Sequence, residues 1–70
     1  MAERLGNSIR AERHARGLTQ VALAEQVGVS RKTINTVENG IFIPSTPLAL
    51  KIARAFGRSV EDVFYLTDDD

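Results

Sequence analysis

The 70-residue chain contains no cysteine and a single histidine, His14. The absence of cysteine excludes a disulfide framework and a thiolate metal site. His14 has no second imidazole at ligand spacing, so we interpret it as an exposed helical residue rather than a metal ligand. We therefore expect no metal and no cofactor.

Long apolar runs are missing as well. No segment approaches the roughly 20 apolar residues that are needed to span a bilayer. The segment MAERLGNSIR at the start lacks the continuous apolar stretch of a secretory signal. These absences favour a cytoplasmic protein without a membrane partner.

The sequence offers no catalytic constellation. It has no nucleophile–base pair, no cluster of metal ligands and no glycine loop of the kind that cradles phosphate. Asp68, Asp69 and Asp70 form a run of carboxylates, but a terminus holds no fixed geometry for a cation. We interpret residues 67–70 as a solubilising acidic tail and do not expect an enzyme.

The formal net charge is zero, but the charges are unevenly distributed. Residues 1–58 contain nine basic and four acidic residues, whereas residues 59–70 contain five acidic residues and no basic one. This asymmetry indicates a basic body, suited to nucleic acid, with an acidic end. A chain of this length makes one domain, expected over residues 1–66. It buries only about 60% of its unfolded surface, so self-association is a natural supplement to its stability.

The stretch from Thr19 to Gly40 has the pattern of two short helices joined by a turn. Thr19 and Ser30 each provide a hydroxyl that can cap the helix that follows. Gly28 stands just past the first helix, where a positive φ is expected. The apolar residues at helical spacing are Leu23, Ala24, Val27, Ile34 and Val37. This pattern is a helix-turn-helix and indicates DNA binding.

Four polar residues remain on the outward face of the second helix: Arg31, Lys32, Asn35 and Thr36. Arg or Lys suits guanine O6 and N7, and Asn suits adenine N6 and N7, whereas Thr can bond to a base or contact a thymine methyl. If this helix enters the major groove, the four are candidate base readers; the alternative is a solvated surface. Thr33, three residues after the cap, is a candidate phosphate contact.

A longer set of residues stands in register with a known family. It comprises Ile9-Arg10, Gly17-Leu18-Thr19-Gln20, Leu23-Ala24, Gly28-Val29-Ser30, Ile34, Glu38-Asn39-Gly40, Pro44-Ser45, Leu50-Lys51-Ile52-Ala53 and Val60-Glu61-Asp62-Val63-Phe64. On these residues the chain resembles the lambda-repressor/Cro-type helix-turn-helix regulators, also called the XRE family, in their short single-domain form. The resemblance covers roughly residues 5–66, and the ordered set makes it specific.

The resemblance implies roles for residues around the motif. It implies phosphate contacts from Gln20, Ser30 and Asn39. It pairs Glu38 with an arginine of the first helix, which is Arg13 here. We expect this ion pair to tie the first helix to the third and to turn Arg13 toward a phosphate, because a lone carboxylate at the inward stripe would be costly.

The helical pattern predicts an all-α, compact five-helix fold of the lambda-repressor type. We expect the first helix over Arg4–Ala15, the fourth to begin with Thr46 as cap and Pro47 at the first helical position, and the fifth to open with a capping box at Ser59. Short family members suggest in addition that residues 65–67 form a short terminal β pairing with the N-terminal residues.

Two apolar segments are candidates for a homodimer interface. Ile41, Phe42 and Ile43 depart from the family's loop, which is often more polar or basic. We expect Phe42 to pack into the core and the two isoleucines to lie at an interface. The second segment, which a chain this small can hardly bury completely, comprises Phe64, Tyr65 and Leu66.

We therefore expect a transcriptional regulator, more specifically a repressor, that binds double-stranded DNA as a homodimer. Its operator would be an inverted repeat with half-site centres about 34 Å apart. Two alternatives stay open. The chain could be an antitoxin or anti-regulator that holds a protein partner, or a controller of restriction–modification genes.

Overall fold

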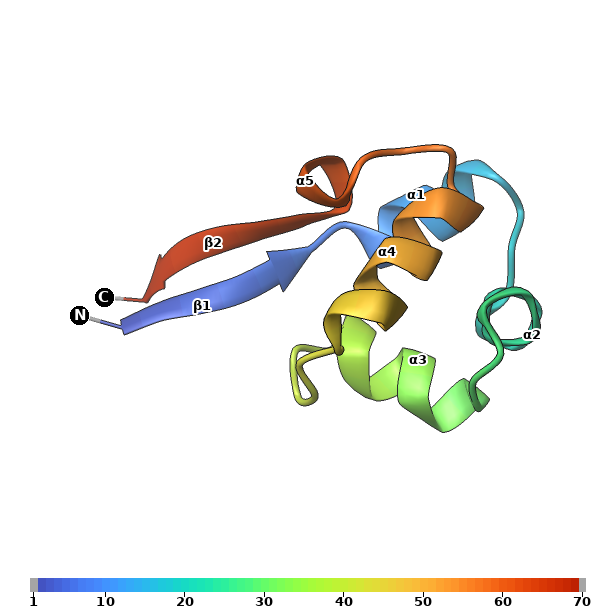
Figure 1. The fold of residues 1–70 in the computed structure, drawn as a ribbon, viewed down its shortest axis with the longest axis horizontal. Helices are drawn as coiled ribbons and strands as arrows, with labels where there is room; N and C mark the ends of the chain where they lie inside the picture. The colour runs from blue at the N-terminus through green and yellow to red at the C-terminus, as the bar shows by residue number, and fades with distance from the viewer. Residues whose placement is uncertain (1, 70) are drawn as a thin grey trace.

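The computed structural model describes residues 2–69, and side chains within residues 3–68. The chain forms, in order, strand β1 (Ala2–Asn7), helices α1 (Ile9–Ala15), α2 (Gln20–Val27), α3 (Arg31–Glu38), α4 (Thr46–Ala55) and α5 (Val60–Val63), and strand β2 (Phe64–Asp69). The helices gather into one body, from which the two strands project (Figure 1). None of the helices in this part of the chain combines the length and hydropathy that a bilayer crossing requires.

The core is built from the apolar face of each helix. Every helix contributes at least one side chain that is almost wholly removed from solvent, and these are Ile9, Leu23, Ile34, Val37, Ile52 and Val63. Burying one such side chain stabilises the fold by about 1.5–3 kcal/mol. The inward positions predicted for α2 and α3 are confirmed, so the opposite face of α3 is left to the surface.

Strands β1 and β2 form an antiparallel two-stranded ribbon, with Leu5 opposite Leu66 and Asn7 opposite Phe64. The ribbon makes the molecule elongated, with extents of 36 × 21 × 21 Å (Figure 1). The predicted terminal β pairing is confirmed. The predicted all-α fold class is wrong in one respect: the fold is mostly helical, but it also includes a two-stranded sheet.

The first helix is shorter than predicted. The residues expected to begin it lie in β1, and α1 starts only at Ile9. The side-chain Oδ1 of Asn7 accepts a hydrogen bond from the backbone N–H of Ile9 at 3.1 Å, so a local turn at Asn7 joins the end of the strand to the start of the helix. The hydrogen-bonding partners of β1 lie in residues 64–69, and no local pattern in the first residues reveals them.

The hydroxyl caps predicted at Thr19, Ser30 and Ser59 are confirmed, and at Ser59 the reciprocal capping box is complete. Helix α4 is capped by Ser45 rather than by Thr46. Ser45 Oγ accepts the backbone N–H of Leu48 at 3.3 Å. Pro47 therefore occupies the second helical position, where a backbone N–H would have no intrahelical acceptor and its absence costs little.

The aromatic side chains are distributed differently from the prediction. Phe64 is buried and only 7% exposed, whereas Phe42, expected in the core, is 50% exposed. Strand β2 brings Phe64 against the helices, so the core is closed without Phe42. Phe42 lies instead at a cleft between the ribbon and the loop after α3, which Leu5 and Ile43 also line.

Residues 67–69, expected in an acidic tail, are the final part of β2, and Asp70 lies outside the described residues. Glu3 pairs with Asp68 in the ribbon, so the ribbon tip is acidic on both strands. This tip lies at the opposite end of the long axis from α2 and from the beginning of α3 (Figure 1).

Candidate nucleic-acid interface

Helices α2 and α3 form the predicted helix-turn-helix. Gly28 ends α2 with φ +76°, the left-handed conformation that glycine adopts without a steric cost. The chain then turns so that Leu23 of α2 and Ile34 of α3 are buried in the same core. The outer face of α3 presents Arg31 and Lys32, both exposed, and beside them Asn35 and Thr36, both half-buried.

Arg31 and Lys32 are the cations of α3, and the side chain of neither makes a hydrogen bond or ion pair with residues 2–69. Other arginines are already engaged. Arg16 pairs with Glu12 at 2.6 Å, and Arg58 approaches the same carboxylate at 3.3 Å. The charges of Arg31 and Lys32 therefore remain available for phosphates and base edges.

The hydroxyls of α3 already have partners within the helix. Ser30 Oγ accepts the Thr33 backbone N–H at 3.1 Å and lies 3.0 Å from Thr33 Oγ1. Thr36 Oγ1 donates to the Thr33 carbonyl oxygen at 3.0 Å. In this structure the Thr36 hydroxyl proton is thus engaged within α3, which leaves the oxygen lone pairs and the methyl group for a base.

The ion pair expected between Arg13 and Glu38 is present, and it is buried. Arg13 Nε donates to Glu38 Oε2 at 2.9 Å and Arg13 Nη2 to Glu38 Oε1 at 2.8 Å, so the pairing is bidentate. The two side chains are 9% and 1% exposed. Arg13 Nη1 also donates to the Leu18 carbonyl oxygen at 2.9 Å. One arginine of α1 thus holds the end of α3 and the segment that leads into α2.

The exposed guanidinium of α1 belongs to Arg10, which the sequence analysis did not single out for a role. Arg10 is 61% exposed, and its Nε donates to Glu38 Oε1 at 3.1 Å. Arg13, by contrast, directs its donors to Glu38 and Leu18 and lies away from the surface. Arg10 and Arg13 are three residues apart and therefore lie on one face of the helix, where both can reach the same carboxylate. This spacing was the signal in the sequence.

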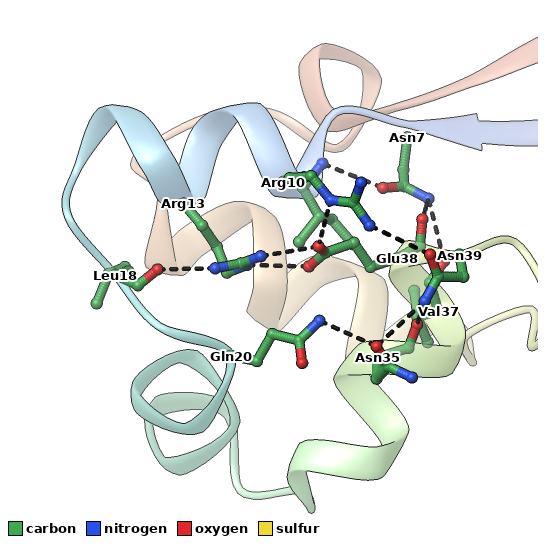
Figure 2. A network of polar contacts seen from close by, with 10 residues as sticks. Asn7, Arg10, Arg13, Leu18, Gln20, Asn35, Val37, Glu38 and Asn39 are labelled. Carbon is green, nitrogen blue, oxygen red and sulfur yellow. Dashed lines mark hydrogen bonds and ion pairs between the residues drawn. The ribbon is translucent and has the colours of Figure 1, made fainter.

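Arg10 begins a chain of side-chain hydrogen bonds that ends beside the candidate base readers (Figure 2). Its Nη2 donates to Asn39 Oδ1 at 3.2 Å. Asn39 Nδ2 donates to the Asn35 carbonyl oxygen at 2.8 Å and to Asn35 Oδ1 at 3.1 Å. Gln20 Nε2 donates to the same Asn35 Oδ1 at 3.2 Å. Gln20, Asn35 and Asn39, which the sequence suggested as separate DNA contacts, therefore form one network.

Asn7 is a second positioning residue that the sequence analysis missed. Its Nδ2 donates to the Val37 carbonyl oxygen at 3.1 Å and to that of Glu38 at 3.4 Å. These are carbonyls of the last turn of α3, so Asn7 ties the base of the ribbon to the end of this helix (Figure 2). The signal was Asn7-Ser8 directly before the apolar Ile9, which is a helix-start pattern.

The carboxyl of Glu38 is held in its charged form. Burial has the largest single effect and by itself raises the pKa, but hydrogen bonds from Arg13 and Arg10 and their charges together outweigh it. The pKa of Glu38 consequently lies below its ordinary value of 4.5. The hydrogen bond from Arg13 to Glu38 likewise raises the pKa of Arg13. Within residues 2–69, no group of three or more histidine or acidic side chains is placed to hold a metal ion.

Replacing Glu38 with Ala leaves the buried Arg13 without its partner. We expect Glu38→Ala to lower the free energy of unfolding by about 3 kcal/mol, because an uncompensated buried charge is costly. The matched control is Arg10→Ala, which removes the exposed partner of the same carboxylate and should cost less than about 1 kcal/mol. Urea denaturation measures both. An unchanged midpoint in Glu38→Ala would contradict the role assigned to the pair.

The same carboxylate predicts a pH dependence. A carboxyl whose pKa is lowered by folding contributes stability that is complete above its unfolded pKa and is lost as pH falls through the folded pKa. The difference in unfolding free energy between the natural protein and Glu38→Gln should therefore shrink as pH is lowered from about 6 to about 3. The pKa of Asp62 is also lowered, by its hydrogen bonds with Ser59, but both proteins share it and its effect cancels. A difference that grows toward acid pH would refute this assignment.

A family model described as helix-turn-helix matches residues 9–63, which span α1 to α5. An uncharacterized HTH-type transcriptional regulator from Methanothermobacter thermautotrophicus is 53% identical over 62 residues, covering 87% of this chain and 90% of that protein. The HTH-type transcriptional regulator YgzD from Bacillus subtilis is 42% identical over 64 residues, covering 91% and 97%.

Solved structures show the same likeness in three dimensions. The restriction-modification controller protein C.AhdI from Aeromonas hydrophila is similar with a TM-score of 0.73 and 33% identity, over 77% of this chain and 82% of that one. With the geometry of α2 and α3, these matches establish the family. The chain belongs to the lambda-repressor/Cro-type, or XRE-type, helix-turn-helix family of DNA-binding transcriptional regulators.

Proposed function

We propose that this protein is a repressor that binds an inverted-repeat operator as a homodimer, with α3 of each protomer in the major groove. The observation that carries the proposal is the pair of exposed cations, Arg31 and Lys32, at the start of α3 without a partner among residues 2–69. The first residues of a recognition helix meet base edges first, and Arg or Lys suits guanine. Asn35 and Thr36 follow along the same face.

Polar residues around α3 are placed to position the protein on the phosphate backbone. Ser30 and Thr33 lie at the start of α3, and Gln20 begins α2. The free N–H groups of a helix start favour an anion. Arg10, exposed beside Asn39, takes the role that the sequence assigned to Arg13. Contacts of this kind fix register and orientation but do not read sequence.

The position of the acidic residues supports DNA binding by the helical body. Glu3 and Asp68 lie in the projecting ribbon, far along the long axis from the start of α3 (Figure 1). Negative charge separated from the interface by more than about 10 Å is largely screened at physiological salt. The basic residues of the body therefore attract DNA although the formal net charge of the chain is zero.

The dimer surface we propose is formed by exposed apolar side chains of the loop after α3 and of β2. Ile41, Ile43 and Leu66 are 77%, 71% and 66% exposed, and Tyr65 is 48% exposed. Phe64 is no longer part of this surface, because it is buried in the core of its own chain. Large apolar side chains that are exposed on a small protein are typical of an interaction site, and Leu66 and Tyr65 offer this on opposite faces of β2. We propose a second copy of this chain as the partner at this surface, because a two-fold symmetric dimer matches an inverted-repeat operator.

A controller of restriction–modification genes is the second candidate. The likeness to the controller protein C.AhdI favours it, since both chains share fold and size. The two roles use the same chemistry on DNA and differ in the genes that are regulated. Restriction and modification genes adjacent to the gene for this protein would identify the controller role.

We expect the protein to be a dimer at micromolar concentration, with twice the 7.7 kDa mass of one chain in light scattering. Ile43→Asp places a charge in the proposed interface and should shift the mass toward that of one chain. Val21→Asp is the matched control, because Val21 is 48% exposed on α2, away from the proposed surface. A strictly monomeric natural protein would overturn the homodimer. Stoichiometric recovery of a different protein would favour the antitoxin or anti-regulator alternative.

Selection of bound sequences from a random duplex library, at about 0.15 M salt because phosphate binding depends on salt, tests the proposed function directly. We expect an enriched inverted repeat with half-sites about one helical turn apart. Arg31→Ala should weaken binding to that operator by about 1–3 kcal/mol and relax the preference at one base pair of each half-site.

The control for this experiment is Arg58→Ala, which removes one positive charge from the loop after α4, where Arg58 pairs with Glu12. It should leave the sequence preference unchanged. A library that shows no enrichment, with only weak salt-sensitive binding, would contradict sequence-specific regulation.

A further inference from the structure

We propose that Asn35 contacts DNA only as a hydrogen-bond donor, and so selects a major-groove acceptor instead of making the two-bond contact with adenine. The inference rests on the proposed function, in which α3 enters the major groove. It contradicts the simple expectation from residue type, because asparagine most often reads adenine by accepting from N6 and donating to N7. The reason lies in the hydrogen bonds that surround the Asn35 amide (Figure 2).

The orientation of the amides is fixed from the Arg10 end of the network. A guanidinium has only donors, so the atom of Asn39 that faces Arg10 Nη2 at 3.2 Å must be the oxygen. The nitrogen of Asn39 is thereby turned toward α3. It meets the Asn35 backbone carbonyl at 2.8 Å, and a carbonyl oxygen can only accept. Two independent partners of Asn39 therefore agree on the same orientation.

The orientation of Asn39 in turn fixes that of Asn35. Asn39 Nδ2 also lies 3.1 Å from the Asn35 side chain, so the Asn35 atom at that position must be the acceptor Oδ1. Gln20 Nε2 donates to the same oxygen at 3.2 Å. An amide oxygen has two lone pairs, and both are occupied within the protein. Turning the Asn35 amide over would place its nitrogen against Asn39 Nδ2 and break that hydrogen bond, and the Gln20 amide would have to turn over with it.

The group that remains for DNA is Asn35 Nδ2. Figure 2 shows the Asn35 oxygen where the bonds from Gln20 and Asn39 meet, with the nitrogen on the other side of the amide. In the major groove, guanine presents two acceptors, O6 and N7, and thymine presents O4. Adenine presents N7 beside the N6 donor, and that donor finds no acceptor on Asn35. Cytosine presents only the N4 donor.

The first experiment locates the contact. Affinities of the natural protein and of Asn35→Ala are measured for every single-base-pair variant of the selected operator. We expect discrimination at one position of each half-site to fall at least about fivefold in Asn35→Ala, and the preferred pair there to present guanine or thymine to Asn35. Preference for cytosine facing Asn35, or no change at any position, would overturn the inference.

Base analogues test donor-only contact at the base itself. If the preferred pair is G·C and the contact is at guanine N7, 7-deazaguanine should weaken binding. If it is A·T, replacing adenine with purine removes the N6 amino group and one Watson–Crick hydrogen bond, so the loss of affinity should be the same for the natural protein and for Asn35→Ala. A loss on removal of N6 that is larger for the natural protein than for Asn35→Ala would show that Asn35 accepts from adenine and would overturn the inference.

A double variant then tests whether the hydrogen-bond network is the reason why Asn35 acts only as a donor. In the double variant Gln20→Ala with Asn39→Ala, neither donor holds Oδ1, so the amide can turn over and accept from adenine. We expect the ratio of affinities for adenine and guanine at the Asn35 position to rise several-fold relative to the natural protein. This ratio is insensitive to a uniform loss of phosphate contacts, and an unchanged ratio would overturn the inference.

The outcome of selection separates the two proposals. If no sequence is enriched, the proposal of sequence-specific regulation is wrong, and the inference about Asn35 is wrong as well because it rests on that proposal. If an inverted repeat is enriched but the Asn35 position depends on the N6 group of adenine, the proposed function stands and the donor-only role of Asn35 is wrong.

Discussion

The position of α3 depends on a single buried carboxylate. The side chain of Glu38 is 1% exposed and accepts hydrogen bonds from two arginines of α1. Through Arg13 it reaches the segment before α2, and through Arg10 it reaches Asn39. A charge in this location is tolerated only because both oxygens are paired. The interaction thus joins α1, the end of α3 and the segment before α2.

Much of the helical body was predictable from local sequence. Thr19, Ser30 and Gly28 mark the ends of α2 and α3, and the apolar spacing gives the buried face of each helix. These signals are local because hydroxyl caps and left-handed glycines act within one helical turn. The ribbon was less accessible. Leu5 pairs with Leu66, and the pattern of residues 4–8 alone also fits a helix.

The candidate site shows a similar division. The exposed positions of Arg31 and Lys32 follow from helical periodicity and from the burial of Ile34. The polarity of the Asn35 amide does not, because it depends on Gln20 from another helix and on a guanidinium two steps away in the network. The residue type defines which donors and acceptors a side chain has, whereas its neighbours determine which of them remain free to bind a base.

The contact between Gly6 and Tyr65 has a consequence for strand pairing. The tyrosine ring lies where a side chain on Gly6 would be, since a Cβ there would fall 2.4 Å from the ring. Tyr65 Oη also donates to the Asn7 carbonyl at 3.3 Å. Sliding the strands by two residues would leave each side chain on the same face of the ribbon, but it would place the tyrosine ring against a residue that has a side chain. An aromatic residue seated on a strand glycine thus pins the register, which a short two-stranded sheet would otherwise specify weakly.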